Sequence, residues 1–131
     1  MKFRSLIFLF TFFTLFSCQK QQSQNVAIVD APTFAKTIET TPQAQILDVR
    51  TPEEFETEHI NDAININWNG NSFVSEAEKL DKTKPVFVYC KSGGRSQKAA
   101  EKLKELGFTD IYELDGGFMQ WSLEGFKSNK N

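Results

Sequence analysis

The chain is poor in the residues that build metal sites. Its 131 residues include one histidine, His59, and two cysteines, Cys18 and Cys90. A lone histidine does not supply the clustered ligands that a protein metal site needs, so we expect no metal. The length is sufficient for one domain with a buried core and too short for two.

The chain also has little excess charge. It carries 15 basic and 17 acidic residues, and Lys2 and Arg4 are the only charged residues among residues 1–17. Without that segment the chain has 13 basic and 17 acidic residues. A net charge of about −4 argues against a general nucleic-acid binder, so we expect no nucleic-acid partner.

The N-terminal apolar run is too short for a permanent membrane span. It extends from Leu6 to Phe16, follows Lys2 and Arg4, and ends at Ser17. A comfortable span of the bilayer takes about 20 apolar residues. A basic start, a short apolar stretch and a small residue at its end predict a secretory signal peptide over residues 1–17.

The end of that segment, Leu15-Phe16-Ser17-Cys18, resembles the bacterial lipobox. The resemblance implies lipidation of Cys18 as the new first residue, with residues 18–25 as a polar tether. We then expect a lipoprotein of the cell envelope that faces the periplasm and is held at a membrane by its lipid. The alternative is an ordinary signal peptide with an incidental cysteine, which leaves a soluble periplasmic protein.

The remaining chain reads as one domain, residues 26–127, followed by a polar tail at residues 128–131. Strand and helix patterns alternate along it without internal repeats. Apolar strand-like runs lie at residues 26–29, 45–49, 86–89 and 111–114, with a short peripheral one at 64–66. Thr51 to Glu54 forms a capping-box pattern that predicts a helix start. This alternation predicts an α/β domain with a mainly parallel sheet and helices on both faces.

Cys90 directly follows the continuously apolar run at residues 86–89, and ligands of parallel sheets bind beyond the carboxyl ends of the strands. A helix pattern begins near Ser96, and the start of a helix offers unpaired N–H groups and the positive end of its dipole. Paired glycines before it allow several N–H groups to converge on an anion. We therefore predict a reactive Cys90 with a lowered thiol pKa, in an anion-binding loop formed by Lys91, Ser92, Gly93, Gly94, Arg95 and Ser96. The alternative is a buried structural cysteine followed by a glycine turn.

Several segments together resemble the rhodanese-like sulfurtransferases, over about residues 28–126. They are the Cys90-x-x-Gly93-x-Arg95 loop, residues 47–55, His59-Ile60, residues 63–66, and Gly116-Gly117 followed by Trp121. The resemblance implies a rhodanese-like three-layer domain with a central, mainly parallel, five-stranded sheet. Around His59 the chain has Glu58 and Asn61-Asp62, where the family often has glycine and Pro-Gly, so one surface turn differs.

The resemblance also implies a chemistry, the transfer of sulfane sulfur through a persulfide on Cys90. The donor would be a small anion such as thiosulfate, held by Arg95 and Lys91. The acceptor would be cyanide or a thiol, on a small molecule or a thioredoxin-like protein. No cofactor is expected, because the enzyme itself carries the sulfur, and we expect a monomer.

Three other functions were weighed. Cysteine-dependent phosphatases of related fold use a Cys-x5-Arg loop, whereas four residues separate Cys90 from Arg95 here, which disfavours phosphatase chemistry. A non-catalytic rhodanese-like binding module and a persulfide or redox sensor at the cell envelope remain open.

Three further groups of residues are interpreted as structural. Asp48 and Arg50, at the end of a buried strand, are expected to support the site through hydrogen bonds or an ion pair. His59 is expected to be structural, because a thiolate prepared by backbone dipoles needs no imidazole base. An acidic run is expected to form a solvated helix face: Glu53, Glu54, Glu56 and Glu58.

Overall fold

The structure, a computed structural model, describes residues 25–130. The signal peptide expected over residues 1–17, the lipidation expected at Cys18 and nearly all of the tether lie outside the described residues. No helix within residues 25–130 has both the length and the apolar composition needed to cross a bilayer.

A five-stranded sheet forms the centre of the domain. Its strands follow the order β1-β6-β5-β2-β4, and every neighbouring pair is parallel. The strands are β1 (Asn25–Val29), β2 (Gln45–Asp48), β4 (Ile64–Asn65), β5 (Val86–Tyr89) and β6 (Asp110–Leu114). All four residues of β5 are buried, as expected for a central strand covered on both faces.

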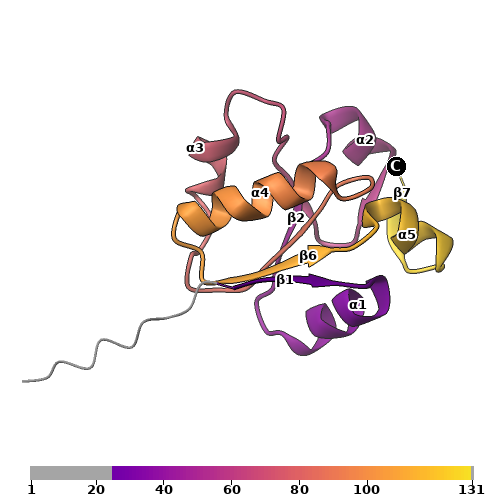
Figure 1. Ribbon diagram of the computed structural model, residues 1–131. Helices are drawn as coiled ribbons and strands as arrows, with labels where there is room; N and C mark the ends of the chain where they lie inside the picture. The colour runs from indigo at the N-terminus through magenta and orange to yellow at the C-terminus, as the bar shows by residue number, and fades with distance from the viewer. Residues whose placement is uncertain (1–24, 131) are drawn as a thin grey trace, which may run out of the picture.

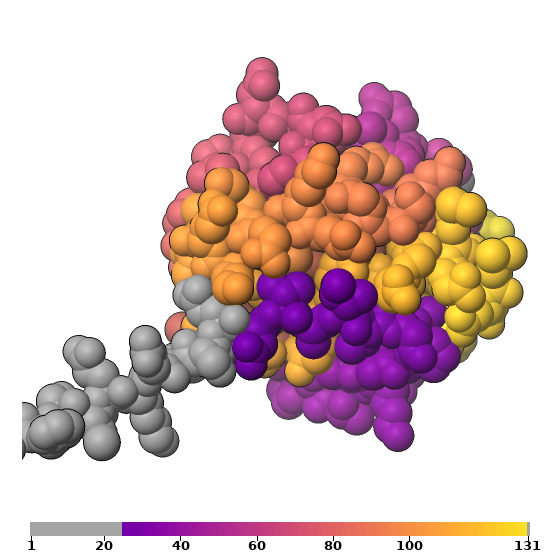
Figure 2. All heavy atoms as spheres, in the orientation of Figure 1, coloured from indigo at the N-terminus to yellow at the C-terminus, as the bar shows by residue number. Residues whose placement is uncertain are grey.

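Helices cover both faces of the sheet, which confirms the predicted fold class (Figure 1). Val86 and Val88 of β5 pack with α3 and α4, and Phe87 and Tyr89 pack with α1 and α5 on the opposite face. The helices are α1 (Ala31–Thr40), α2 (Pro52–Thr57), α3 (Phe73–Ala77), α4 (Gly94–Glu105) and α5 (Gly117–Leu123). Figure 2 shows the side chains of α4 above the sheet edge formed by β1 and those of α1 below it.

Two short strands form a second, antiparallel sheet. It pairs β3 (Glu58–Ile60) with β7 (Ser128–Lys130), and the Ser128 hydroxyl donates a hydrogen bond to the Glu58 carboxylate. Residues 128–130 of the expected polar tail thus belong to the fold. The strand was not predicted because the sequence Ser-Asn-Lys has no apolar alternation. Backbone pairing with β3, and not burial of side chains, forms this strand.

The starts of α2 and α4 lie near Cys90 and shape the region around it. The capping box is confirmed: Glu54 N–H donates to Thr51 Oγ1 at 3.3 Å, and Thr51 N–H donates to Glu54 Oε2 at 2.9 Å. α4 starts at Gly94, two residues before the predicted start near Ser96, with Gly93 as its N-cap. The loop between β5 and α4 is correspondingly short.

Candidate active site

β5 delivers Cys90 to the carboxyl end of the sheet, directly before α4. The side chain is buried, and the residue exposes 1% of its surface. Gly93 N–H donates to Cys90 Sγ at 3.0 Å, and Ser96 Oγ lies 3.3 Å from the same sulfur. A hydroxyl and a backbone amide therefore both contact the sulfur.

These contacts determine the ionisation of Cys90. Burial alone would raise the pKa of the thiol, because an apolar environment disfavours the thiolate. Hydrogen bonds from the Ser96 side chain and from the backbone N–H groups of Ser96, Gly93 and Ser92 outweigh burial and lower the pKa below its ordinary value. The loop thus stabilises a thiolate.

Of the two loop glycines, only Gly93 has a backbone conformation that side chains avoid. Its φ is +116°, in the region that favours glycine, and its N–H donates to Cys90 Sγ. Gly94 is the first residue of α4, and a Cβ added there would meet nothing within 4 Å. The sequence predicts this conformational freedom at both glycines, but only Gly93 has a positive φ.

Arg95 points to a carboxylate rather than to an open site. Its two terminal nitrogens lie 2.7 and 3.1 Å from the two oxygens of Glu54. The hydrogen bonds from Arg95 lower the pKa of Glu54 to about 2, against the opposing effect of burial. The expectation of a solvated helix face is therefore wrong for Glu54, which ties α2 to the start of α4, and for Glu58, which lies in β3 and accepts a hydrogen bond from Ser128. The guanidinium still acts electrostatically on Cys90.

Asp48 and Arg50 form a buried ion pair below the loop. Asp48 accepts hydrogen bonds from the Arg50 backbone at 2.9 Å and from Arg50 Nη2 at 2.6 Å. Tyr89, the residue before Cys90, donates its hydroxyl to Asp48 at 2.6 Å and accepts from Ile60 N–H at 3.0 Å. Arg50 Nη2 also donates to the Glu58 carbonyl at 2.7 Å. This network fixes β2, β3 and β5 around the nucleophile.

The start of α5 holds the other side of the loop. Phe118 N–H donates to the Cys90 carbonyl at 2.8 Å, and Met119 N–H donates to the Lys91 carbonyl at 3.0 Å. At Gly117, which has a φ of +60°, an added Cβ would lie 2.5 Å from the Lys91 oxygen and 2.7 Å from the Cys90 oxygen. Glycine is therefore required for α5 to approach the loop this closely.

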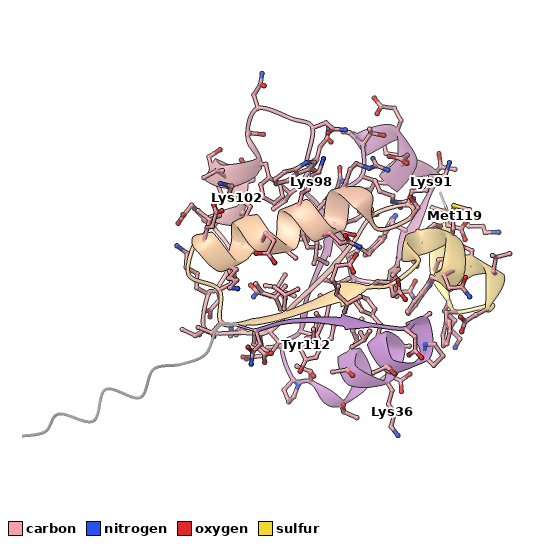
Figure 3. The ribbon with its side chains drawn as sticks, in the orientation of Figure 1. Lys36, Lys91, Lys98, Lys102, Tyr112 and Met119 are labelled. Atoms are coloured by element: carbon pink, nitrogen blue, oxygen red, sulfur yellow. The ribbon has the colours of Figure 1, made fainter. Side chains whose placement is uncertain are left out.

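A cavity of about 360 Å³ lies beside the loop. Lys91 and Met119, both exposed, lie next to each other at this end of the molecule (Figure 3). The lining residues are Arg50, Glu54, Thr57, Glu58, Lys91, Phe118, Met119 and Ser122. The cavity offers a small ligand one exposed cation, Lys91, beside apolar side chains.

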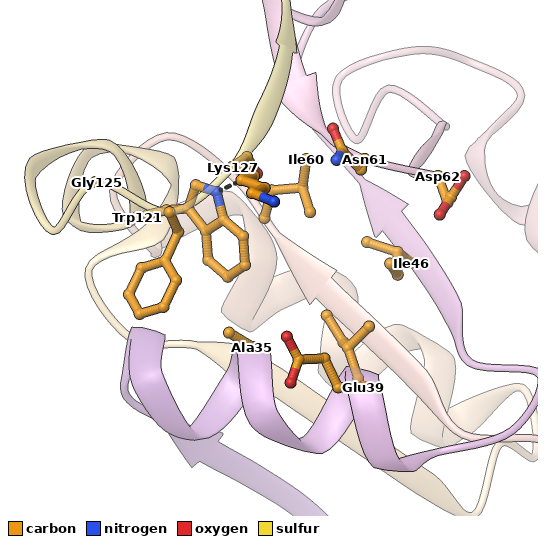
Figure 4. A pocket seen from close by; sticks show the side chains of 11 residues that line it. Ala35, Glu39, Ile46, Ile60, Asn61, Asp62, Trp121, Gly125 and Lys127 are labelled. Atoms are coloured by element: carbon orange, nitrogen blue, oxygen red, sulfur yellow. Dashed lines mark hydrogen bonds between the residues drawn. The ribbon is translucent and has the colours of Figure 1, made fainter.

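A second cavity, of about 460 Å³, lies between α1 and the C-terminal segment (Figure 4). Trp121 lines it and donates from Nε1 to the Lys127 carbonyl at 3.1 Å. The residues of the Cys90 loop do not line it. Several of its lining residues belong to the core on the α1 side of the sheet, opposite α4.

His59 contacts Phe55 and belongs to no cluster of potential metal ligands within residues 25–130. His59 Nδ1 lies 2.9 Å from the Phe55 carbonyl, and its ring stacks on Phe55 with centroids 3.9 Å apart. Within residues 25–130, no three His, Cys, Asp or Glu side chains gather in a way that could hold a metal ion.

The sequence analysis did not assign three residues that contact the site. Glu54 and Tyr89 gave no local signal, because their partners lie 41 positions away along the chain. Glu113, whose Oε1 is hydrogen-bonded to Ser96 Oγ, did give one, since it is a charged residue inside the apolar run from Ile111 to Leu114. A carboxyl in a buried strand is costly unless it is paired or neutral.

The chain was compared with known proteins. A family model described as rhodanese-like domain matches residues 30–124. The thiosulfate sulfurtransferase GlpE of Coxiella burnetii is 41% identical over 86 residues, which cover 66% of this chain and 78% of that protein. The protein YqhL of Bacillus subtilis is 42% identical over 79 residues, 60% of this chain and 61% of that protein's length.

A solved structure has the same architecture. The rhodanese-related protein of Thermoplasma volcanium superposes with a TM-score of 0.70 at 29% sequence identity. The matched region covers 79% of this chain and 97% of that protein.

Proposed function

Since the chain belongs to the rhodanese-like domain family, we propose that it is an enzyme that transfers sulfane sulfur from a donor such as thiosulfate to a thiophilic acceptor. The relationship to a thiosulfate sulfurtransferase supports this activity. The observation that carries the proposal is the sulfur of Cys90, which a hydroxyl and backbone N–H groups stabilise as a thiolate at the start of α4.

In the first step the Cys90 thiolate attacks the outer sulfur of thiosulfate. A sulfur–sulfur bond forms to Cys90, the sulfur–sulfur bond of thiosulfate breaks, and its electron pair leaves with sulfite. The loop N–H groups that face the thiolate also face the resulting persulfide anion. Because Cys90 exposes 1% of its surface, the terminal atom of a slender donor is suited to reach it.

In the second step an acceptor attacks the outer sulfur of the persulfide. With cyanide, a carbon–sulfur bond forms, the persulfide bond breaks, and the Cys90 thiolate returns as thiocyanate leaves. A thiolate acceptor leaves as a new persulfide by the same displacement. The transferred sulfur stays at the sulfane oxidation level, and the electron pair of each broken bond remains with the leaving group, so the cycle needs no oxidant, reductant or cofactor.

Two cations act on the donor in different ways. Lys91 is exposed at the cavity and would contact the sulfonate directly. Arg95 is held by Glu54, so it would contribute positive potential from a fixed position. The sequence analysis expected both as direct ligands, and the geometry favours Lys91 in that role.

The test is the intact mass of the full chain before thiosulfate, after thiosulfate, and after subsequent cyanide. We expect the chain to gain one sulfur atom, which cyanide removes as thiocyanate. Cys90→Ser, the matched control, should gain none. A sulfur gain that no acceptor removes would indicate a persulfide sensor instead. No gain from thiosulfate, a small persulfide or mercaptopyruvate, with Cys90 free, would overturn the enzyme and favour a binding module.

We also propose that this enzyme acts at the cell envelope, as a periplasm-facing lipoprotein anchored through Cys18. The basic start, the apolar run and the lipobox-like Leu15–Cys18 segment support this location. Cell fractionation tests it: the wild-type chain should stay with the membranes, and Cys18→Ser should be released. Membrane retention of both would exclude the lipid as anchor, and release of both would favour a soluble periplasmic protein.

A further inference from the structure

A buried carboxyl lies next to the nucleophile on the neighbouring strand. Glu113 of β6 pairs with Val88 of β5 and has no exposed surface. Its Oε1 is hydrogen-bonded to Ser96 Oγ, which lies 3.3 Å from Cys90 Sγ. One hydroxyl therefore links the carboxyl to the sulfur.

The Ser96 hydroxyl has a single hydrogen and three neighbours. The third neighbour is the Gly93 carbonyl at 3.2 Å, which already accepts from Gln97 N–H at 3.1 Å. A thiolate is a stronger acceptor than this neutral carbonyl, and an ionised carboxylate is a stronger acceptor still. The charge on Glu113 therefore decides which neighbour receives the hydrogen.

The surroundings of Glu113 favour its neutral form. Its Oε2 is buried without a hydrogen-bond partner, which is far more costly for a carboxylate than for a carboxylic acid. Burial raises the pKa of Glu113 most strongly. The hydrogen bond with Ser96 lowers this pKa, and the nearby negative charge of Asp115 raises it further. The residues of α4 near Glu113, Ser96 and Gln97, are neutral. The positive charge of Arg95, on the same helix, is paired with Glu54.

We propose that neutral Glu113 is a positioning residue for the nucleophile: it donates to Ser96 Oγ and so directs the Ser96 hydroxyl hydrogen to the Cys90 sulfur. Both hydrogens stay on their own oxygens, so no bond is made or broken. When Glu113 ionises, the Ser96 hydrogen turns to the carboxylate. The thiolate then loses a donor and gains a negative neighbour. This inference rests on the proposed function, in which the thiolate attacks an anionic donor.

The test uses Glu113→Gln, whose amide donates to Ser96 at every pH and never ionises. We would follow alkylation of Cys90 in the full chain by peptide mass, with neutral iodoacetamide and with anionic iodoacetate. In the wild type, the ratio of the iodoacetate rate to the iodoacetamide rate should fall about tenfold as rising pH ionises Glu113. In Glu113→Gln this fall should be absent. Equal pH profiles for the two proteins would overturn the proposal.

Two controls separate positioning from packing and from charge alone. Asp115→Asn removes an exposed negative charge just after the same strand without touching Ser96, and it should keep the size of the wild-type fall but shift it to lower pH, because this charge raises the pKa of Glu113. In a Ser96→Ala background, Glu113→Gln should lose most of its effect on the pH profile of the iodoacetamide rate, because the linking hydroxyl is gone, whereas the ratio of the two rates, which follows the charge of Glu113, should still respond. A full effect of Glu113→Gln on the iodoacetamide profile in that background would also overturn the proposal.

A measurement on the wild type keeps the proposal testable if Glu113→Gln does not fold. The infrared spectrum at neutral pH should contain a carboxylic-acid carbonyl band from a buried protonated carboxyl, and its absence would overturn the proposal. Neither readout requires a sulfur donor. Failure of persulfide formation would therefore refute the proposed function alone, and identical alkylation profiles would refute the role of Glu113 alone.

Discussion

At the residue scale, the two loop glycines have different roles. Gly93 has a φ of +116° and turns its N–H to Cys90, whereas Gly94 is an ordinary first helical residue with open space around its Cβ position. A side chain at positive φ costs about 1–2 kcal/mol. The pair therefore provides a matched experiment.

Gly93→Ala should lower the free energy of unfolding by about 1–2 kcal/mol, because alanine is strained at positive φ. It should also raise the thiol pKa of Cys90, because the N–H of residue 93 moves away from the sulfur. Gly94→Ala should change the free energy of unfolding by less than about 1 kcal/mol and leave the thiol pKa unchanged. Urea unfolding and the pH dependence of iodoacetamide alkylation measure both quantities. Equal effects of the two substitutions would contradict the role assigned to Gly93.

At the scale of elements, the Arg95–Glu54 ion pair connects α2 to α4. The pKa of Glu54 falls from its ordinary value of 4.5 to about 2 in the folded chain. The folded state thus favours the carboxylate, and the resulting stability is fully present above about pH 4.5. It is lost as the pH falls from 4.5 to about 2.

Glu54→Gln should therefore lower the free energy of unfolding by about 1–2 kcal/mol at neutral pH, and the difference from the wild type should vanish toward pH 2. Glutamine keeps the side-chain oxygen of the capping box, so the loss reports on the ion pair. Urea unfolding across this pH range is the measurement. Glu53→Gln, an exposed neighbour in the same turn, should show no such trend, and a parallel trend in both would refute the assignment.

The local parts of the site could be predicted from the sequence, and the pairings between elements could not. The strand, the glycines, the cations and the helix start around Cys90 lie within one short stretch of sequence, so a reactive cysteine in an anion-binding loop could be predicted from them. The partners Glu54 and Arg95 are 41 positions apart, and only the folded arrangement brings them together. Glu113 was recognisable as a charge in an apolar strand, but its contact with Ser96 depends on β6 lying beside β5.

At the scale of the whole molecule, the C-terminal strand β7 closes the domain against β3. Deletion of residues 128–131 removes this pairing and the Ser128–Glu58 hydrogen bond. We expect a loss of about 1–2 kcal/mol in the free energy of unfolding, because a few backbone hydrogen bonds are lost, with persulfide formation preserved. Thermal unfolding and the intact-mass assay check this. Loss of sulfur uptake by a folded truncated chain would contradict it.

The all-parallel sheet also gives the molecule a direction. Every strand of the five-stranded sheet runs the same way, so the chain enters β1 at one pole of that sheet (Figure 1), and Cys90 follows the end of β5 at the opposite pole. Strands of four to five residues separate these poles by about 15 Å. An attachment ahead of Asn25 therefore holds the domain by its base. If that attachment is a lipid, the reactive loop of the enzyme faces away from the membrane. Acceptors can then approach the loop from the aqueous side.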